Sequence, residues 1–241
     1  LKILSLPVNQ SIWGLLIVLF IAMVVVSQFM LTFGSDPNAK VTKKSKSPLS
    51  FHPIALIFGL LSFVSYLVEG AVGDWSALYL FEDKGILIEE AVMGVMLFNG
   101  TMCIGRLLGN RLGKHLTSKQ VVVGGYLLGS IAMGLIVFLP GHASMYTYLL
   151  LGISLAMIVP NLFSAMGEQN VIPMTQAVAT STMLGYMGIL MGPALIGFIA
   201  HGTSLTVAFI VLTTLLVVRA GIGKYAYHLM SKDCGLSEEQ I

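Results

Sequence analysis

The stretch PIALIFGLLSFVSYLVEGAVGDWSALYL, residues 53–80, is a long apolar run that contains only two charged side chains, Glu69 and Asp74. A helix that crosses a bilayer needs about 20 largely apolar residues, because each residue advances the helix by only about 1.5 Å. Transmembrane strands are shorter and alternate in polarity, and this run does not alternate. The stretch therefore predicts a membrane-spanning helix.

The whole chain has the same character, with 241 residues of which 56% are hydrophobic and 10% charged, and a mean hydropathy of +0.89. Soluble domains contain about 25% charged residues, and a soluble core of this length cannot hide so much apolar surface. Six further runs are long and apolar enough to span a bilayer. Together they predict an all-α membrane protein with seven transmembrane helices, at residues 12–33, 53–80, 91–109, 121–140, 144–166, 177–200 and 203–221.

Lysine and arginine collect in alternate connections between these runs. The connection at residues 34–50 carries four lysines, the next basic loop carries Arg111, Lys114 and Lys119, and the tail carries Arg219, Lys224 and Lys232. Residues 81–90 instead carry four acids and one lysine. Because basic loops stay in the cytoplasm, we predict that the chain starts outside and ends inside.

The unequal connections predict how the chain is organised. Residues 34–50 are polar and rich in Lys, Ser and Pro, which is typical of a flexible linker. We expect a single helix at 1–33, a cytoplasmic basic linker at 34–50, a six-helix domain at 51–228 and a cytoplasmic tail at 229–241. The six helices are expected to form two inverted three-helix repeats, as in many secondary transporters.

Three local motifs resemble the major facilitator superfamily. Residues 105–114, GRLLGNRLGK, resemble its signature loop, with Asn110 where the family usually has Asp; residues 69–79, EGAVGDWSALY, and 185–193, GYMGILMGP, resemble the seventh and eleventh helices of its bacterial fucose-permease-like branch. Over nearly its whole length the chain is similar to helices six to twelve of this family. The resemblance implies a transporter of the bacterial inner membrane whose amino-terminal half is missing from this sequence.

The function expected is secondary active transport of a small polar solute by alternating access, with no enzymatic activity and no cofactor. The resemblance suggests a sugar-like cargo, and an acid within a span suggests symport with protons. The partners expected are the lipid bilayer, a small-molecule substrate and the missing amino-terminal half. Neither nucleic acid nor a metal is expected, since there is no basic patch with interleaved aromatics and only two cysteines, Cys103 and Cys234, occur.

Two alternatives stay open, namely a transport-inactive membrane fragment and a seven-helix, receptor-like protein. A retinal-type photoreceptor needs a lysine in the last span to form a Schiff base, and residues 203–218 contain none. A membrane enzyme is disfavoured because no span pairs a nucleophile with a histidine base.

Glu69 is the main candidate for both substrate binding and proton coupling. An ionised carboxylate deep in a span is costly unless it is paired or hydrated. Its helical neighbours are polar or small and form one stripe, which should face the bundle interior or a wet cavity: Ser62, Ser65, Tyr66, Gly73 and Ser76. The alternative is a structural acid that is hydrogen-bonded to another helix.

Three further residues are candidates for substrate binding. Asn99 and Asn161 lie inside spans, and Pro160 directly precedes Asn161. Proline interrupts helical hydrogen bonding, and broken helices mark many transporter binding sites; the alternative for both amides is an interhelical hydrogen bond. Tyr186 is the side chain on its span that can donate to a sugar-like hydroxyl.

A cytoplasmic gate is predicted from Arg106, Arg111 and Glu168, which belong near the cytoplasmic ends of their helices. Arg106 and Glu168 are expected to pair across that mouth when it is closed, and family members that the chain resembles use arginine–acid pairs there. A static surface ion pair is the alternative. The glycines of the span at 177–200 are expected to allow close helix packing, with Pro193 adding a kink.

Overall fold

The computed structural model describes residues 8–33, 49, 51–112, 116–169 and 171–234. All regular structure in these ranges is α-helical, so the predicted all-α class is confirmed. The chain divides after Ser45 into two compact units, and each is described by itself. Apart from Leu49, the predicted linker at 34–50 lies outside the described residues.

The first unit contains one helix, α1 (Val8–Phe33), which corresponds to the first predicted span. Its described side chains between Leu16 and Gln28 are exposed within this unit, and nearly all of them are apolar. An apolar helix that is exposed on all sides needs lipid or a protein partner around it. The helix therefore fits the membrane position that the sequence predicts.

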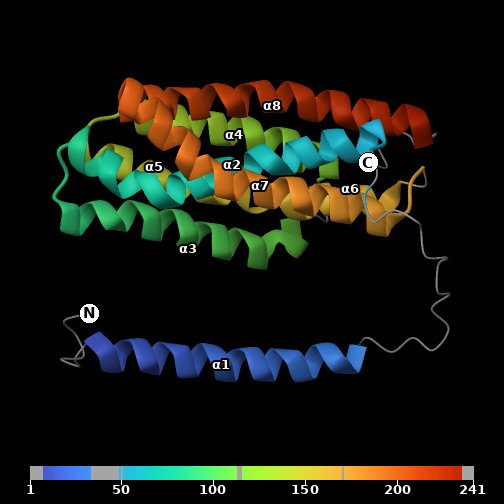
Figure 1. Cartoon of the computed structure of the whole chain (residues 1–241), viewed down its shortest axis with the longest axis horizontal. Coiled ribbons are helices and arrows are strands. Elements are labelled where there is room, and N and C mark those ends of the chain that lie inside the picture. Colours follow the sequence, from blue (N-terminus) through green and yellow to red (C-terminus); the bar gives the residue numbers. More distant parts are fainter. Residues whose placement is uncertain (1–7, 34–48, 50, 113–115, 170, 235–241) are drawn as a thin grey trace. The chain divides into compact units, whose positions relative to one another are not determined.

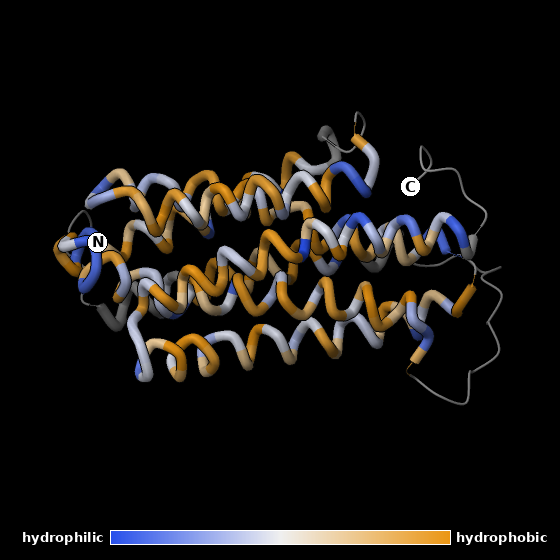
Figure 2. Tube along the Cα trace, turned by 90° about the horizontal axis from the view of Figure 1, so that it is seen from above, coloured by the Kyte–Doolittle hydropathy of each residue, from blue (hydrophilic) through white to orange (hydrophobic). Residues whose placement is uncertain are grey.

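The second unit is a bundle in which six spans lie side by side (Figure 1). Each span is long and apolar enough to cross a membrane, with α5 and α6 together forming one span, Gly141–Glu168. Apolar residues fill the middle of the helices and hydrophilic ones gather toward their ends (Figure 2). The helices are α2 (Pro53–Glu82), α3 (Ile88–Leu112), α4 (Ser118–Phe138), α5 (Gly141–Ala156), α6 (Ile158–Glu168), α7 (Met174–Gly202) and α8 (Leu205–Cys234).

Successive spans alternate in direction, so the bundle has two ends. We call the end at which α2 begins the inner end, because Lys119 and Lys232, which belong to segments predicted to be cytoplasmic, lie at the helix ends there. The opposite end is the outer end. At the inner end α8 continues to Cys234, past residue 221, where the last span was predicted to stop, and past the predicted domain boundary at 228. The helix outlasts the apolar run because Ala226, Tyr227 and Met230 are still buried against the bundle.

Helix α2 packs closely against the glycine-rich helix α7, and we call this contact the α2–α7 seam. A Cβ atom at Gly188 would overlap the carbonyl oxygen of Phe63, and one at Gly192 would meet that of Leu67. The prediction that these glycines allow close packing is confirmed. Near the outer end, the indole Nε1 of Trp75 donates to the carbonyl oxygen of Pro193 at 2.9 Å.

The α3–α5 seam is built in a similar way. A Cβ atom at Gly152 of α5 would overlap the carbonyl oxygen of Phe98 on α3, and one at Gly105 of α3 would collide with the side chain of Ala156. Helices that approach this closely exchange many van der Waals contacts, which is how membrane helices associate. Two glycine seams therefore join α7 to α2 and α3 to α5.

The fifth predicted span, residues 144–166, is divided in the structure. Helix α5 ends at Ala156 and α6 starts at Ile158. Pro160 lacks the N–H that would bond the Ala156 carbonyl, and its ring excludes that carbonyl from a regular helical position. The backbone N and the side-chain Nδ2 of Asn161 both donate to the carbonyl oxygen of Met157, at 3.2 and 2.8 Å. The break that Pro160 predicts is thus located at Met157.

Candidate functional site

An ion pair lies within the membrane-spanning part of the bundle. Nη2 of Arg106 on α3 is 3.3 Å from both Oε1 and Oε2 of Glu69 on α2. The Glu69 side chain is 22% exposed and that of Arg106 is 44% exposed. Both charges therefore lie at a partly exposed surface between two helices.

Two tyrosines extend this ion pair toward α7. Tyr66 lies one turn before Glu69 on α2, and its ring stacks on that of Tyr186 with centroids 6.1 Å apart and planes 5° from parallel. The Tyr186 side chain is exposed. We refer to Tyr66, Glu69, Arg106 and Tyr186 as the Glu69 cluster. It joins three helices through contacts that no local sequence pattern contains.

Three of the five residues predicted to form a polar stripe with Glu69 are buried in the bundle, namely Ser62, Ser65 and Ser76. Ser62 and Ser65 are buried and donate to the carbonyl oxygens of Phe58 and Leu61, one turn earlier on α2. These bonds satisfy both hydroxyls locally. Only the part of the stripe at Tyr66 and Glu69 contributes to the open cluster.

The face of α3 next to the cluster carries another predicted residue. Asn99 is exposed, seven residues before Arg106, and its Nδ2 donates to the Val95 carbonyl oxygen at 3.0 Å. Cys103 lies between them and is also exposed. At helical spacing these three side chains share one face, so α3 adds an amide and a thiol beside the ion pair.

Asn161 makes the kind of contact that was the alternative to substrate binding, an interhelical hydrogen bond, and its role in substrate binding stays a prediction. Besides bonding Met157, its Oδ1 accepts a hydrogen bond from Ser118 Oγ at the start of α4, at 3.4 Å. The structure thus places Asn161 at the junction of α6 with α4, at the inner end. The contacts described for it are those of an interhelical link and include no member of the Glu69 cluster.

The predicted gate is not formed in this conformation. Among the described residues, Arg106 pairs with Glu69 and not with Glu168, because Arg106 lies on the face of α3 that turns toward the middle of α2. Glu168 is exposed at the inner end, where α6 ends. Arg111 belongs to α3, but its side chain lies outside the described residues.

One charged residue, Arg219, is buried where the sequence predicts an exposed one. Arg219 was assigned to the basic tail, whereas in the structure it lies within α8 and is only 2% exposed. Loop charges are assigned by counting residue types near the ends of apolar runs, which does not reveal the direction of a side chain. The signal in the sequence was an arginine inside the predicted span at 203–221.

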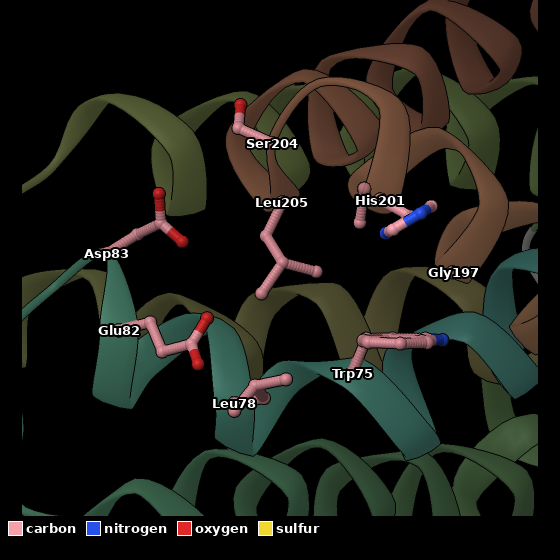
Figure 3. A pocket seen from close by; sticks show the side chains of 9 residues that line it. Trp75, Leu78, Glu82, Asp83, Gly197, His201, Ser204 and Leu205 are labelled. Carbon is pink, nitrogen blue, oxygen red and sulfur yellow. The ribbon is translucent and has the colours of Figure 1, made fainter.

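A separate cavity of about 460 Å³ opens at the outer end, between α2, α7 and the start of α8 (Figure 3). Figure 3 shows the carboxylates of Glu82 and Asp83 on one side and Trp75 and His201 on the other. Asp83 is already engaged, because its Oδ1 accepts a hydrogen bond from Thr206 at 2.8 Å. No group of three or more metal-ligating side chains occurs among the residues that the structure describes.

No protein-family model matches the chain. An uncharacterized MFS-type transporter of Yersinia pestis is 42% identical over 157 residues, which are 64% of this chain and 40% of that protein. Membrane protein MosC of Rhizobium meliloti is 30% identical over 170 residues, or 69% of this chain and 42% of that protein. The chain therefore spans about two fifths of the length of the curated relatives that it matches.

The fold also resembles solved structures. A structure of a variant of the Escherichia coli fucose:proton symporter FucP matches 73% of this chain and 43% of its own, with a TM-score of 0.64 and 16% sequence identity. Another structure, of the Major Facilitator Superfamily (MFS) transporter FucP in the outward conformation, matches 72% of this chain with a TM-score of 0.62. At this identity the likeness concerns the fold alone.

Proposed function

We propose that the chain forms the carboxyl-terminal half of a secondary transporter. It is related to MFS-type transporters, and its six-span bundle has the fold of part of a major facilitator superfamily transporter. The cargo is a small polar solute of sugar-like chemistry, and the driving ion is a proton. The chain is an integral membrane protein, and its bacterial relatives point to the inner membrane. Its role is transport rather than catalysis.

The observation that carries the proposal is the ion pair between Glu69 and Arg106 at a partly open surface of the bundle. An ionised Glu69 attracts Arg106 and so links α2 to α3. A proton on Glu69 removes its charge and with it most of the attraction. Glu69 thus takes a proton from one side of the membrane, α3 is released, and the proton leaves when the cavity faces the other side.

The rest of the cluster suits a polar solute with an apolar face. The rings of Tyr66 and Tyr186 offer a flat surface and two hydroxyls, and Asn99 offers an amide that donates and accepts. FucP, whose fold the bundle resembles, is a fucose:proton symporter, and this is the reason for proposing a sugar-like cargo and a proton as the coupling ion. Arg106 and Glu69 supply the charged hydrogen-bonding groups that orient hydroxyls.

Native Cys103 provides the test, because it lies between Asn99 and Arg106 on the proposed cavity face. In the whole transporter, with every other cysteine replaced by serine, the rate of N-ethylmaleimide labelling is measured in membrane vesicles against a panel of sugars, polyols, amino acids and organic acids. The same panel is tested for uptake. We expect the transported solute to slow labelling of Cys103 by at least about threefold.

The matched control is Ile104→Cys in a Cys103→Ser background, since Ile104 is exposed on the same helix and lies about 100° around the helix axis from Cys103. Its labelling should not depend on the solute. A transported solute that leaves the Cys103 rate unchanged would show that this face of α3 is not the binding site. Absence of uptake for every member of the panel would count against a sugar-like or other small polar cargo.

A further inference from the structure

Arg219 is a permanent charge inside the bundle. It lies in α8 with 2% of its surface exposed, and a guanidinium stays protonated at any physiological pH. The salt bridges between described residues join Arg106 to Glu69 and His142 to Glu90, so no carboxylate in the described part of the chain compensates it. A buried charge without an acid partner needs other polar groups around it.

Backbone carbonyl and aromatic groups take the place of the acid. Nη1 of Arg219 donates to the carbonyl oxygen of Leu60 on α2 at 2.6 Å, and Nη2 donates to the same oxygen. The guanidinium carbon lies 5.5 Å from the ring centroid of Tyr126 on α4, a distance that suits a cation–π contact. Arg219 Nε has no hydrogen-bond partner among the described residues.

The adjacent carbonyl of α2 is held as well. The Tyr126 hydroxyl donates to the carbonyl oxygen of Leu61 at 3.1 Å and lies 2.7 Å from Ser65 Oγ. Two consecutive carbonyls of α2 therefore receive side-chain donors, one from α8 and one from α4. On its other side, the same part of α2 is held by the α2–α7 seam, through Phe63 and Leu67.

A charge is an expensive way to fill space, because well-packed apolar side chains of similar volume are often at least as stabilising as a buried ionic group. What an arginine adds is direction, since its planar fork bonds an oxygen in one geometry. Leu60 precedes Glu69 by nine residues, or about 14 Å along the helix axis. Fixing Leu60 therefore fixes the height and rotation of Glu69.

We propose that Arg219 is a positioning residue which, together with Tyr126, locks α2 to α8 and α4 so that Glu69 meets Arg106. At 2% exposure it cannot touch the solute, so it acts through α2. The proposal rests on the proposed function, because Glu69 is the group that it presents. In the transport cycle α2 is then the fixed element, and α3, which carries Arg106, is the element that moves.

Cross-linking in the whole transporter tests this without any transported solute. Glu69→Cys and Arg106→Cys are combined in a cysteine-free background, and the rate of cross-linking by a short bis-methanethiosulfonate is compared with Arg219 intact and with Arg219→Met. We expect Arg219→Met to slow this reaction by at least fivefold. The control pair is Glu90→Cys with His142→Cys, whose side chains meet at 2.9 Å between α3 and α5 at the outer end; its rate should stay within about twofold.

Tyr126→Phe keeps the ring beneath the guanidinium and removes the hydroxyl, and it is expected to slow the reaction between positions 69 and 106 by about twofold. An unchanged rate in Arg219→Met overturns the proposal. So does an equal fall for both cysteine pairs, which would mean that the bundle as a whole has loosened. If Arg219→Met does not fold, the Tyr126→Phe rate decides in the same way. Because no solute is involved, these outcomes stand whether or not uptake is found.

Discussion

The α2–α7 seam and the α3–α5 seam use the same contact, a glycine set against the carbonyl of a phenylalanine: Gly188 against Phe63 in the first and Gly152 against Phe98 in the second. They differ in the central helix that each contains. Helix α2 runs without interruption from Pro53 to Glu82, whereas α5 stops at Ala156 and its span resumes as α6. Close packing therefore does not decide which helix stays whole.

The difference lies in what each sequence does to the backbone. In α2 the only proline is at the first turn, where a missing N–H costs nothing, and the carbonyls of Leu60 and Leu61, about two turns further along, receive extra donors from α8 and α4. In the other span Pro160 is internal and leaves Ala156 without its helical donor. One seam therefore contains an unbroken helix with the candidate proton site, and the other contains a span that is divided at Met157.

The largest effect is expected for Gly188→Ala, which tests whether the α2–α7 seam is as tight as described. The added methyl would overlap the Phe63 carbonyl oxygen, and backbone on both sides leaves it no easy way to move. Overpacking of this kind typically costs about 1–3 kcal/mol, so we expect a clear loss of thermal stability in detergent. Gly152→Ala should lose a similar amount in the second seam.

The matched control is Gly100→Ala on α3, where a Cβ atom meets nothing within 4 Å. Its stability should equal that of the parent or rise by up to about 1 kcal/mol, because alanine is a better helix former than glycine and the added methyl meets no atom. Equal melting temperatures for Gly188→Ala and Gly100→Ala would contradict this account, because the seams would then be no tighter than the open face of α3.

A smaller effect is expected for Pro160→Ala, which sharpens the contrast between the two central helices. The new N–H can bond the Ala156 carbonyl and close the gap between α5 and α6, so stability should rise, or fall by no more than about 1 kcal/mol. Transport should slow if the bend is part of the cycle. Measurements of melting in detergent and uptake in vesicles check both. A loss of stability as large as that of Gly188→Ala would mean that the break is a packing requirement instead.

Much of this fold could be predicted from the sequence, because span length and apolar runs are set by the bilayer itself. Residues 53–80 became α2 with two more residues at its outer end. The end of α8 could not be found in this way, since its last turns are held by buried Tyr227 and Met230 beyond the apolar run. Each glycine seam joins the first helix of one predicted three-helix repeat to the second helix of the other. The repeat itself stays a prediction.

The site was harder to predict than the spans. Glu69 stood out because an acid within a span is costly, and Tyr186 because it was a polar tip on a glycine-rich helix. The partner of Glu69 did not, because Arg106 is 37 residues away and their meeting depends on how α2 and α3 cross. Asn161 was chosen because it lies next to the break at Pro160; its amide bonds Met157 and Ser118, which no local sequence pattern indicates, and its role in substrate binding stays a prediction.

Glu69→Gln tests the central claim most directly. Glutamine keeps the shape and the hydrogen-bonding oxygen but cannot alternate between charged and neutral forms. In proteoliposomes of the whole transporter, solute uptake is measured with and without an imposed pH gradient, together with counterflow, which needs no net proton movement. Glu69→Ala, which also removes the polar contacts, should impair both reactions.

The account predicts that Glu69→Gln abolishes pH-driven accumulation, by at least about tenfold, and keeps counterflow within about threefold of the parent. Accumulation of solute up its gradient by Glu69→Gln at the parent's level would contradict the account and leave the pair of Glu69 with Arg106 as a structural link between α2 and α3.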